Sequence, residues 1–160
     1  MEPTLNPTEI PSALPTERPS VMYNGHYYHL TNARLTWTEH EREANVWGGH
    51  LASILDQGEL DFIMKAIINV SDPNEGSFFI GGMRRNESEA RDKTGDSWRW
   101  SDGNTWDFYN WNEWEPNSID EKMVEMYRDG KWNDMRDYSW RKRLGIYKKV
   151  RNLFSIQEIC

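Results

Sequence analysis

The sequence predicts an α+β fold, in which two helices come first and short strands joined by long loops follow. A capping-box spacing at residues 36–39 and an apolar stripe at residues 60–68 each indicate a helix in the first half. After residue 77, short aromatic segments alternate with Gly, Asn and Asp, as is typical of strands and turns. The chain has 160 residues, enough for one domain with a buried core. Helices and strands segregated in this way define the α+β class.

The first helix is expected from about Trp37 to Trp47. Thr36 and Glu39 lie three residues apart, so each side chain is placed to bond the backbone N–H of the other. Gly48-Gly49 supplies the stop, because glycine readily adopts the left-handed conformation that ends many helices. A turn followed by a strand is expected before this helix, at residues 23–30, and a short strand after it, at residues 50–54.

The second helix is expected to begin after Asp56, because Asp56 and Glu59 repeat the capping spacing. Apolar residues then recur at i, i+3 and i+4, which indicates a buried helical stripe that stops near Val70. The stripe consists of Leu60, Ile63, Met64, Ile67 and Ile68.

Short strands and long loops are expected in the second half of the chain. Residues 84–132 show little regular structure, and loops of that length inside a domain are usually functional or disordered. Six of the nine tryptophans lie from Trp98 to Trp132. Because large aromatic side chains dominate burial energetics, we expect most of them in the core and the loops to be ordered. The expected strands are residues 78–82, 97–101, 124–127, 131–132 and 145–149.

The first 20 residues differ in composition from the rest of the chain. Proline recurs at every fourth position from Pro3 to Pro19, and Thr or Ser follows each one. A segment with so little apolar content does not offset its ordering entropy by burial, so we expect a disordered, extended spacer at residues 1–20. We therefore expect the folded domain at residues 21–150 and a C-terminal tail at residues 151–160.

Charge and composition argue against several classes of partner. The formal net charge is −7, whereas proteins that bind nucleic acid usually carry a basic face. No run of about 18 apolar residues is present, so no membrane insertion is expected. Cys160 is the only cysteine, so neither an internal disulfide nor a cysteine-based zinc site is expected, and the four histidines lack zinc spacing.

Oxygen-bearing side chains gather in two stretches, residues 111–117 and 131–134. Carboxylates, amides and carbonyls are the ligands of calcium, which takes about 6–8 oxygens. An incomplete shell accepts two hydroxyls of a sugar, so the pattern predicts a calcium site that binds carbohydrate. Any one of these residues is also a common turn former, and that ordinary explanation competes with the site. The candidate ligands are Glu115, Asn117, Glu121, Asn133 and Asp134.

Pro116 lies between the first two candidate ligands. A cis X–Pro bond costs only about 0.5–1 kcal/mol, so a cis bond before Pro116 is an accessible way to turn both neighbouring side chains toward one ion. Asn133 and Asp134 would then reach the ion from a neighbouring strand.

Several motifs occur in the order that is typical of a C-type lectin domain, and the chain resembles this family over about residues 22–149. The resemblance implies a fold with two helices packed on small antiparallel sheets and a long calcium-binding loop. It also implies that the five candidate ligands bind calcium and the sugar hydroxyls together. By the same resemblance, the Glu-Pro-Asn order selects mannose- or glucose-type sugars. The motifs are Trp37-Thr38-Glu39, residues 48–54, Phe79-Ile80-Gly81, residues 98–103, Tyr109-Asn110-Trp111, Glu115-Pro116-Asn117 and Trp132-Asn133-Asp134.

Two features depart from the pattern of that family. The disulfide cysteines are replaced, with Ala44, Met123 and Tyr27 at three of their places, so a fold without disulfides is expected. The segment 117–121 is shorter than in many members, which leaves Asp120 as an alternative ligand to Glu121. Four further acids either form a solvated loop or act as ligands of a second calcium. These are Glu87, Glu89, Asp92 and Asp96.

We therefore expect calcium-dependent binding of mannose-type glycans by a protein located outside the cell or on its surface. The alternative is a lectin-like domain that binds proteins. Catalysis is not expected, because a glycosidase needs two carboxylates across a cleft, one with a raised pKa, and the sequence shows no pocket that would raise one. Weak single-site sugar binding usually requires several copies, so the spacer fits a part of a longer or multivalent protein.

Overall fold

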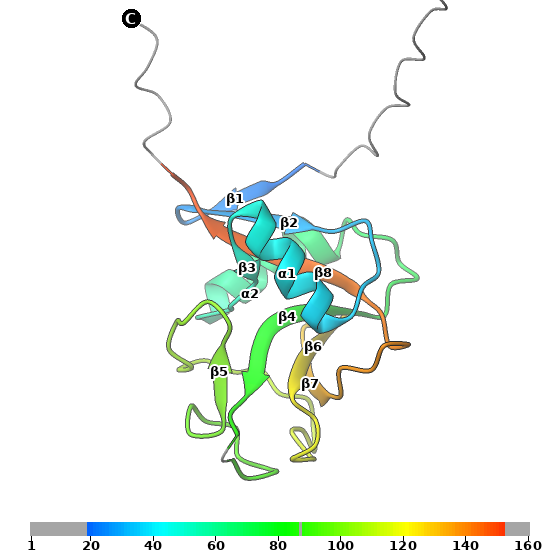
Figure 1. Ribbon diagram of the computed structural model, residues 1–160. Coiled ribbons are helices and arrows are strands. Elements are labelled where there is room, and N and C mark those ends of the chain that lie inside the picture. Colours follow the sequence, from blue (N-terminus) through cyan, green and yellow to red (C-terminus); the bar gives the residue numbers. More distant parts are fainter. Residues whose placement is uncertain (1–18, 87, 153–160) are drawn as a thin grey trace, which may run out of the picture.

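The computed structural model describes residues 19–86 and 88–152 (Figure 1). Most of the predicted spacer, the tail from residue 153 and Glu87 lie outside these described residues. One sheet of eight strands organises the fold, with the order β1-β2-β8-β4-β6-β7, while β3 pairs with β8 and β5 pairs with β4. Figure 1 shows both helices beside β2 and β8, and the long loops at the opposite end of the molecule, around β5, β6 and β7.

The elements follow the predicted order. The helical segments are α1 Trp37–Trp47, α2 Gln57–Ile63 and the π-helical η1 Met64–Ile68. The strands are β1 Val21–Tyr23, β2 His26–Leu30, β3 His50–Leu51, β4 Ser77–Arg84, β5 Trp98–Trp100, β6 Met123–Tyr127, β7 Trp132–Met135 and β8 Leu144–Val150. No helix in the described part of the chain is long and apolar enough to cross a membrane.

The capping box of α1 is confirmed. The Thr36 hydroxyl accepts the backbone N–H of Glu39 at 3.2 Å, and the Glu39 carboxylate accepts that of Thr36 at 2.9 Å. Gly48 ends the helix with a φ of 94°. A third partner comes from far along the chain, because the carboxylate of Asp137 accepts the backbone N–H of Trp37 at 2.9 Å. This contact ties the segment after β7 to the start of α1.

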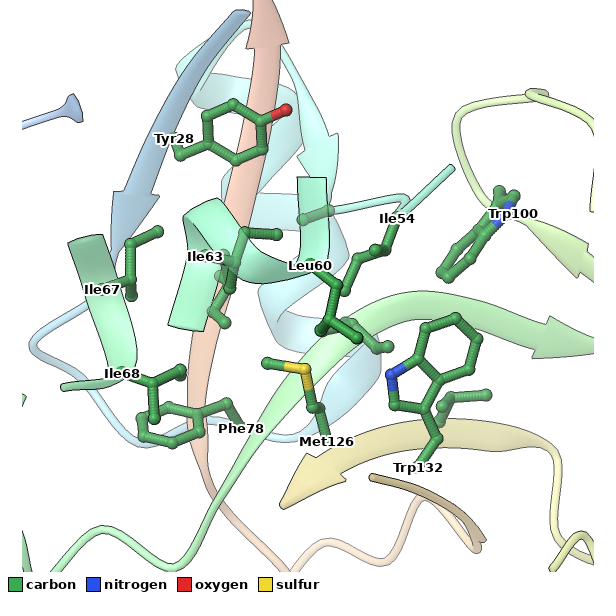
Figure 2. Close-up of a cluster of buried hydrophobic side chains, with 14 of the residues drawn as sticks. Tyr28, Ile54, Leu60, Ile63, Ile67, Ile68, Phe78, Trp100, Met126 and Trp132 are labelled. Carbon is green, nitrogen blue, oxygen red and sulfur yellow. The ribbon is translucent and has the colours of Figure 1, made fainter. Parts of the chain in front are cut away.

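The second helix begins where the capping signal predicts and continues through η1, ending two residues before Val70. Asp56 caps it by accepting the backbone N–H of Glu59 at 2.8 Å. Four members of the predicted stripe are buried, and Met64 packs at its edge. Figure 2 shows Leu60, Ile63, Ile67 and Ile68 pointing into the space that Phe78 and Met126 fill from the sheet.

The sheet differs from the predicted small antiparallel sheets, because β4 runs parallel to β8 and joins the two halves of the fold into one mixed sheet. Two strand ends also differ. The predicted strand at 50–54 is regular only over His50–Leu51, whereas β7 extends to Met135. Polar residues 133 and 134 continue β7 because Glu125 and Val124 of β6 pair with them.

Tryptophans fill the core beneath the long loops, as predicted. Trp98, Trp100, Trp106, Trp111 and Trp132 are buried and lie in one cluster, with Trp100 and Trp106 centroids 4.4 Å apart. The core therefore reaches under the loops and holds them in place.

The places of the missing cysteines are filled by packing. Ala44 is fully buried in a cluster with Tyr147, whose hydroxyl lies 2.8 Å from Nδ1 of His40. Met123 pairs across the sheet with Met135. Apolar contacts at these two places replace the covalent links.

Candidate functional site

The candidate site lies where the loop between β5 and β6 meets β7. Backbone bonds fix this loop to the strand, with the N–H of Asn112 donating to Trp132 at 2.8 Å and that of Trp132 donating to Asn110 at 2.9 Å. The Glu115–Pro116 peptide bond is cis. The loop is thus anchored by main-chain bonds just before the Glu-Pro-Asn motif.

Asp134 is the centre of the site. Its side chain is fully buried, and its carboxylate accepts the backbone N–H groups of Asn117 at 3.1 Å and Ser118 at 3.3 Å. The same carboxylate accepts a bond from the Arg84 guanidinium at 2.9 Å. Asp134 therefore holds the loop that follows the cis bond and meets a buried cation at the same time.

Glu115 and Glu121 bring further negative charge to Asp134. Burial, a hydrogen bond with Asp134 and the charge of Asp134 raise the pKa of Glu115 to about 7. Burial and the charge of Asp134 also raise the pKa of Glu121. Oxygen Oε2 of Glu115 is buried and has no hydrogen-bond partner among the described residues. The expectation that no pocket raises the pKa of a carboxylate is therefore wrong for Glu115.

Arg84 is a functional residue that the sequence reasoning missed. Its side chain is fully buried, and its guanidinium lies 4.2 Å from the centroid of the Trp98 ring. Nε donates to the carbonyl of Glu121 at 2.9 Å, while Nη1 and Nη2 donate to the carbonyls of Glu89 at 2.8 Å and Ala90 at 3.2 Å. One side chain therefore joins both long loops to β7. The only sequence signal was an arginine at the end of a buried strand.

Three carboxyl groups meet at the site, and Arg84 is the cation that contacts Asp134 directly. Arg91 acts on Glu115, and Arg136 and Arg141 act on Glu121, yet the pKa values of both glutamates remain raised. Among residues 19–86 and 88–152, no three Asp, Glu, His or Cys side chains are already gathered as a metal-binding cluster. The Glu115 oxygen that lacks a partner among the described residues and the raised pKa values of two neighbouring glutamates nevertheless fit a divalent cation with hard oxygen ligands.

Asn133 and Asp120 lie apart from this centre. Adjacent residues of a strand face opposite sides, and the Asn133 amide donates to Glu125 at 3.1 Å. Asp120 is exposed and pairs with Arg136 at 3.3 Å. The structure thus places the backbone of Asn117 against Asp134, and the charge of Asp134 acts on Glu115 and Glu121. Of the two alternatives, Glu121 rather than Asp120 is coupled to Asp134.

The proposed second calcium ligands border a separate hollow of about 610 Å³. Glu89, Asp92 and Asp96 line it together with Arg91, while Glu87 lies outside the described residues. A solvated acidic loop and a second calcium site both stay open as explanations of these acids.

Comparison with known sequences identifies relatives. Human layilin is 36% identical over 113 residues, which cover 70% of this chain and 29% of layilin. Mouse chondrolectin is 30% identical over 66% of this chain and 40% of its own length. A lectin of Pleurodeles waltl is 31% identical over 70% of this chain and 63% of its own length. The chain therefore spans less than half of layilin and chondrolectin.

Solved structures share the fold. Human lithostathine superposes with a TM-score of 0.70 at 22% identity, over 86% of this chain and 99% of its own. The cow carbohydrate-recognition domain of CD23 gives 0.68 at 23% identity, over 88% and 98%. A calcium-independent type II antifreeze protein gives 0.66 at 23% identity, over 86% and 95%.

The profile of the Lectin C-type domain family matches residues 33–143, which include both helices, most of the sheet and every residue of the candidate site. Proteins of this family bind carbohydrate and are not enzymes. This match, the shared fold and the sequence relatives agree, and the chain belongs to the C-type lectin domain family.

Proposed function

We propose that this domain binds mannose- or glucose-type sugars through a calcium ion held by the Asp134 site. One observation carries the proposal: a buried carboxylate oxygen of Glu115, without a hydrogen-bond partner among the described residues, lies in a site where burial and the charge of Asp134 oppose the ionisation of two glutamates. Burying unbalanced charge is costly unless a ligand balances it. Calcium would supply that positive charge and direct bonds to two sugar hydroxyls.

Four predicted ligands would hold the ion from one side, namely Glu115, Asn117, Glu121 and Asp134. Asn133 stays outside this set, because adjacent residues of β7 face opposite sides and its Nδ2 donates to Glu125 at 3.1 Å. Arg84 and the two backbone N–H groups on Asp134 would hold that carboxylate in position.

The mannose-type preference rests on the order of the motif. Glu115 precedes and Asn117 follows Pro116, so an acceptor carboxylate and a donor amide meet the two hydroxyls in a fixed order. The resemblance to the family associates this order with equatorial 3- and 4-hydroxyls. Among similar folds, the cow CD23 domain was studied with a GlcNAc2Man3 oligosaccharide and SPL-1 with GlcNAc.

Titration calorimetry with methyl α-mannoside and methyl galactoside, in calcium and in chelator, tests the function. We expect mannoside binding only in calcium, and a reversed preference in the double variant Glu115→Gln, Asn117→Asp. Glu113→Gln is the matched control, because Glu113 is an exposed acid two residues away. Equal mannoside binding in chelator would contradict the calcium requirement.

A protein-binding domain without calcium is the second candidate. It is favoured by the Arg84–Asp134 pair, because a cation already contacts one proposed ligand. One similar fold is likewise a calcium-independent protein. Calorimetry with calcium alone separates the two functions, since no heat of calcium binding would favour this candidate.

The biological setting remains part of the proposal. We place the domain outside the cell or at its surface, where calcium is abundant, and in a longer or multivalent protein. Attachment of several domains would raise the avidity of a weak sugar site.

A further inference from the structure

The segment between β7 and β8 carries an aromatic surface that the calcium site does not use. Tyr138 and Trp140 stack with ring centroids 5.1 Å apart and an interplanar angle of 12°. The side of Trp140 that faces away from Tyr138 is open, because this residue is 73% exposed. We call Tyr138 and Trp140 the aromatic platform.

The aromatic platform is held in place rather than free. Arg136 donates to the Tyr138 hydroxyl at 2.8 Å, and its guanidinium lies 6.0 Å from the centroid of that ring. Arg136 also pairs with Asp120 at 3.3 Å. A flat ring that is already oriented loses less freedom on binding than a mobile one. Trp114 differs from Trp140, because it is 74% exposed and stacks on no other aromatic ring in the described part of the chain.

The same contacts place the aromatic platform beside the proposed sugar site. Asp120 follows Asn117 by three residues in the loop, and Tyr138 follows Asp134 by four residues, a span of at most about 14 Å of chain. In Figure 1 the segment after β7, in orange, turns back beside β7 before it enters β8.

We propose that the aromatic platform is a second sugar subsite, which stacks against the next pyranose ring of an oligosaccharide whose terminal residue is bound at the Asp134 site. Pyranose rings have an apolar face of C–H groups, and an exposed, oriented indole is the surface that such a face covers best. This inference rests on the proposed function and makes it more specific, because it predicts a preference for oligosaccharides over monosaccharides.

The test compares methyl α-mannoside with mannotriose by calorimetry in calcium. We expect the trisaccharide to bind roughly three- to tenfold more tightly in the wild-type protein, the range expected of one aromatic contact. Trp140→Ala should abolish this gain and leave the monosaccharide affinity unchanged. Trp140→Phe should keep part of the gain, because a flat ring remains on Tyr138.

Trp114→Ala is the matched control, since it removes an equally exposed indole from the same end of the molecule. A gain that persists in Trp140→Ala, or one that is lost only in Trp114→Ala, would overturn the second subsite and leave the proposed function intact. Absence of binding by both mannosides in calcium would overturn both proposals. A parallel fall in both affinities on Trp140→Ala would also reject the second subsite.

Discussion

Two buried carboxylates of this fold meet a cation in different ways. Glu59, in the half that holds the helices, contacts Lys148 at 2.5 Å, and both side chains are almost fully buried. The Tyr28 hydroxyl donates to the same Glu59 oxygen at 2.5 Å, and the N–H of Leu55 donates to the other at 2.8 Å. One acid and one base balance, so this centre is neutral and both oxygens are satisfied.

Asp134 contacts Arg84 in an equally buried pair, yet two further acids lie beside it. Glu115 and Glu121 have raised pKa values, and one Glu115 oxygen has no partner among the described residues. The neutral centre is explained by folding alone. Neighbouring acids with raised pKa values in a loop are instead typical of a place that receives a ligand. The Glu59–Lys148 pair therefore stabilises the fold, whereas the Arg84–Asp134 pair also positions a carboxylate of the candidate site.

The largest expected effect comes from Arg84→Met. Removing the partner of a buried charge costs about 3–5 kcal/mol, and we expect the upper end because three carbonyl groups also lose their donor. Urea unfolding in chelator measures the loss. Calcium should restore part of this stability, since the ion supplies positive charge to Asp134. A loss that calcium leaves unchanged would show that Arg84 and the ion do not share this carboxylate.

Lys148→Met is the matching change in the neutral centre. We expect the lower end of the same range, about 3 kcal/mol, because Glu59 keeps the hydroxyl of Tyr28 and the N–H of Leu55. Calcium should give no selective rescue, and the double variant with Glu59→Gln should recover stability. Rescue by calcium as large as in Arg84→Met would remove the distinction between the two centres.

Local signals explain how much of the fold could be predicted. The Thr36–Glu39 spacing placed the start of α1 and Gly48 placed its end, because both signals act within a few residues. The parallel pairing of β4 with β8 could not be read in the same way. It joins Phe78 to Leu144, residues far apart in sequence, and no local pattern specifies such a pair.

The candidate site was predictable only in part for the same reason. Contiguous motifs could be recognised in the sequence, whereas contacts between distant residues could not. The Glu-Pro-Asn and Trp-Asn-Asp motifs named residues that the fold brings to one end of β7, since each motif is contiguous. Arg84 was missed because its four acceptors come from three separate segments, and Asn133 faces Glu125 because of strand pairing. The raised pKa of Glu115 was missed because burial arises only when the loop folds over Asp134.

Glu115→Gln should have different effects on the stability of the calcium-free protein and on the stability gained by binding calcium. A neutral amide removes like charge beside Asp134, so stability in chelator should stay equal or rise. The calcium-dependent gain should disappear, whereas the wild-type protein gains about 2.7 kcal/mol when calcium is at 100 times its Kd. Thermal unfolding with and without calcium measures both. Glu113→Gln should retain the gain, and its loss there would point to a general effect of charge.

The smallest expected effect is a loss of stability at acid pH. It comes from His40, in the half of the fold that holds the helices. His40 is fully buried, and its Nε2 donates to the carbonyl of Arg143 at 2.8 Å while Nδ1 accepts from the Tyr147 hydroxyl at 2.8 Å. Burial lowers the pKa of His40 below its ordinary value of 6.5. The bond to the Arg143 carbonyl and the charges of three nearby acids oppose this shift without reversing it. The acids are Glu39, Glu43 and Asp137.

Because the folded pKa of His40 lies below the unfolded one, its stabilising effect is complete above about pH 6.5 and is lost as the pH falls. Urea unfolding between about pH 8 and pH 5, carried out in the Glu115→Gln background because the raised pKa of Glu115 has the opposite effect, should therefore show a decline in stability on the acid side. His40→Gln keeps an amide donor and acceptor but does not titrate, so it should flatten this decline. His26→Gln on β2 should leave it unchanged. An unaltered acid decline in His40→Gln would show that a group other than His40 causes the loss of stability, because the raised pKa values of Glu115 and Glu121 act in the opposite direction.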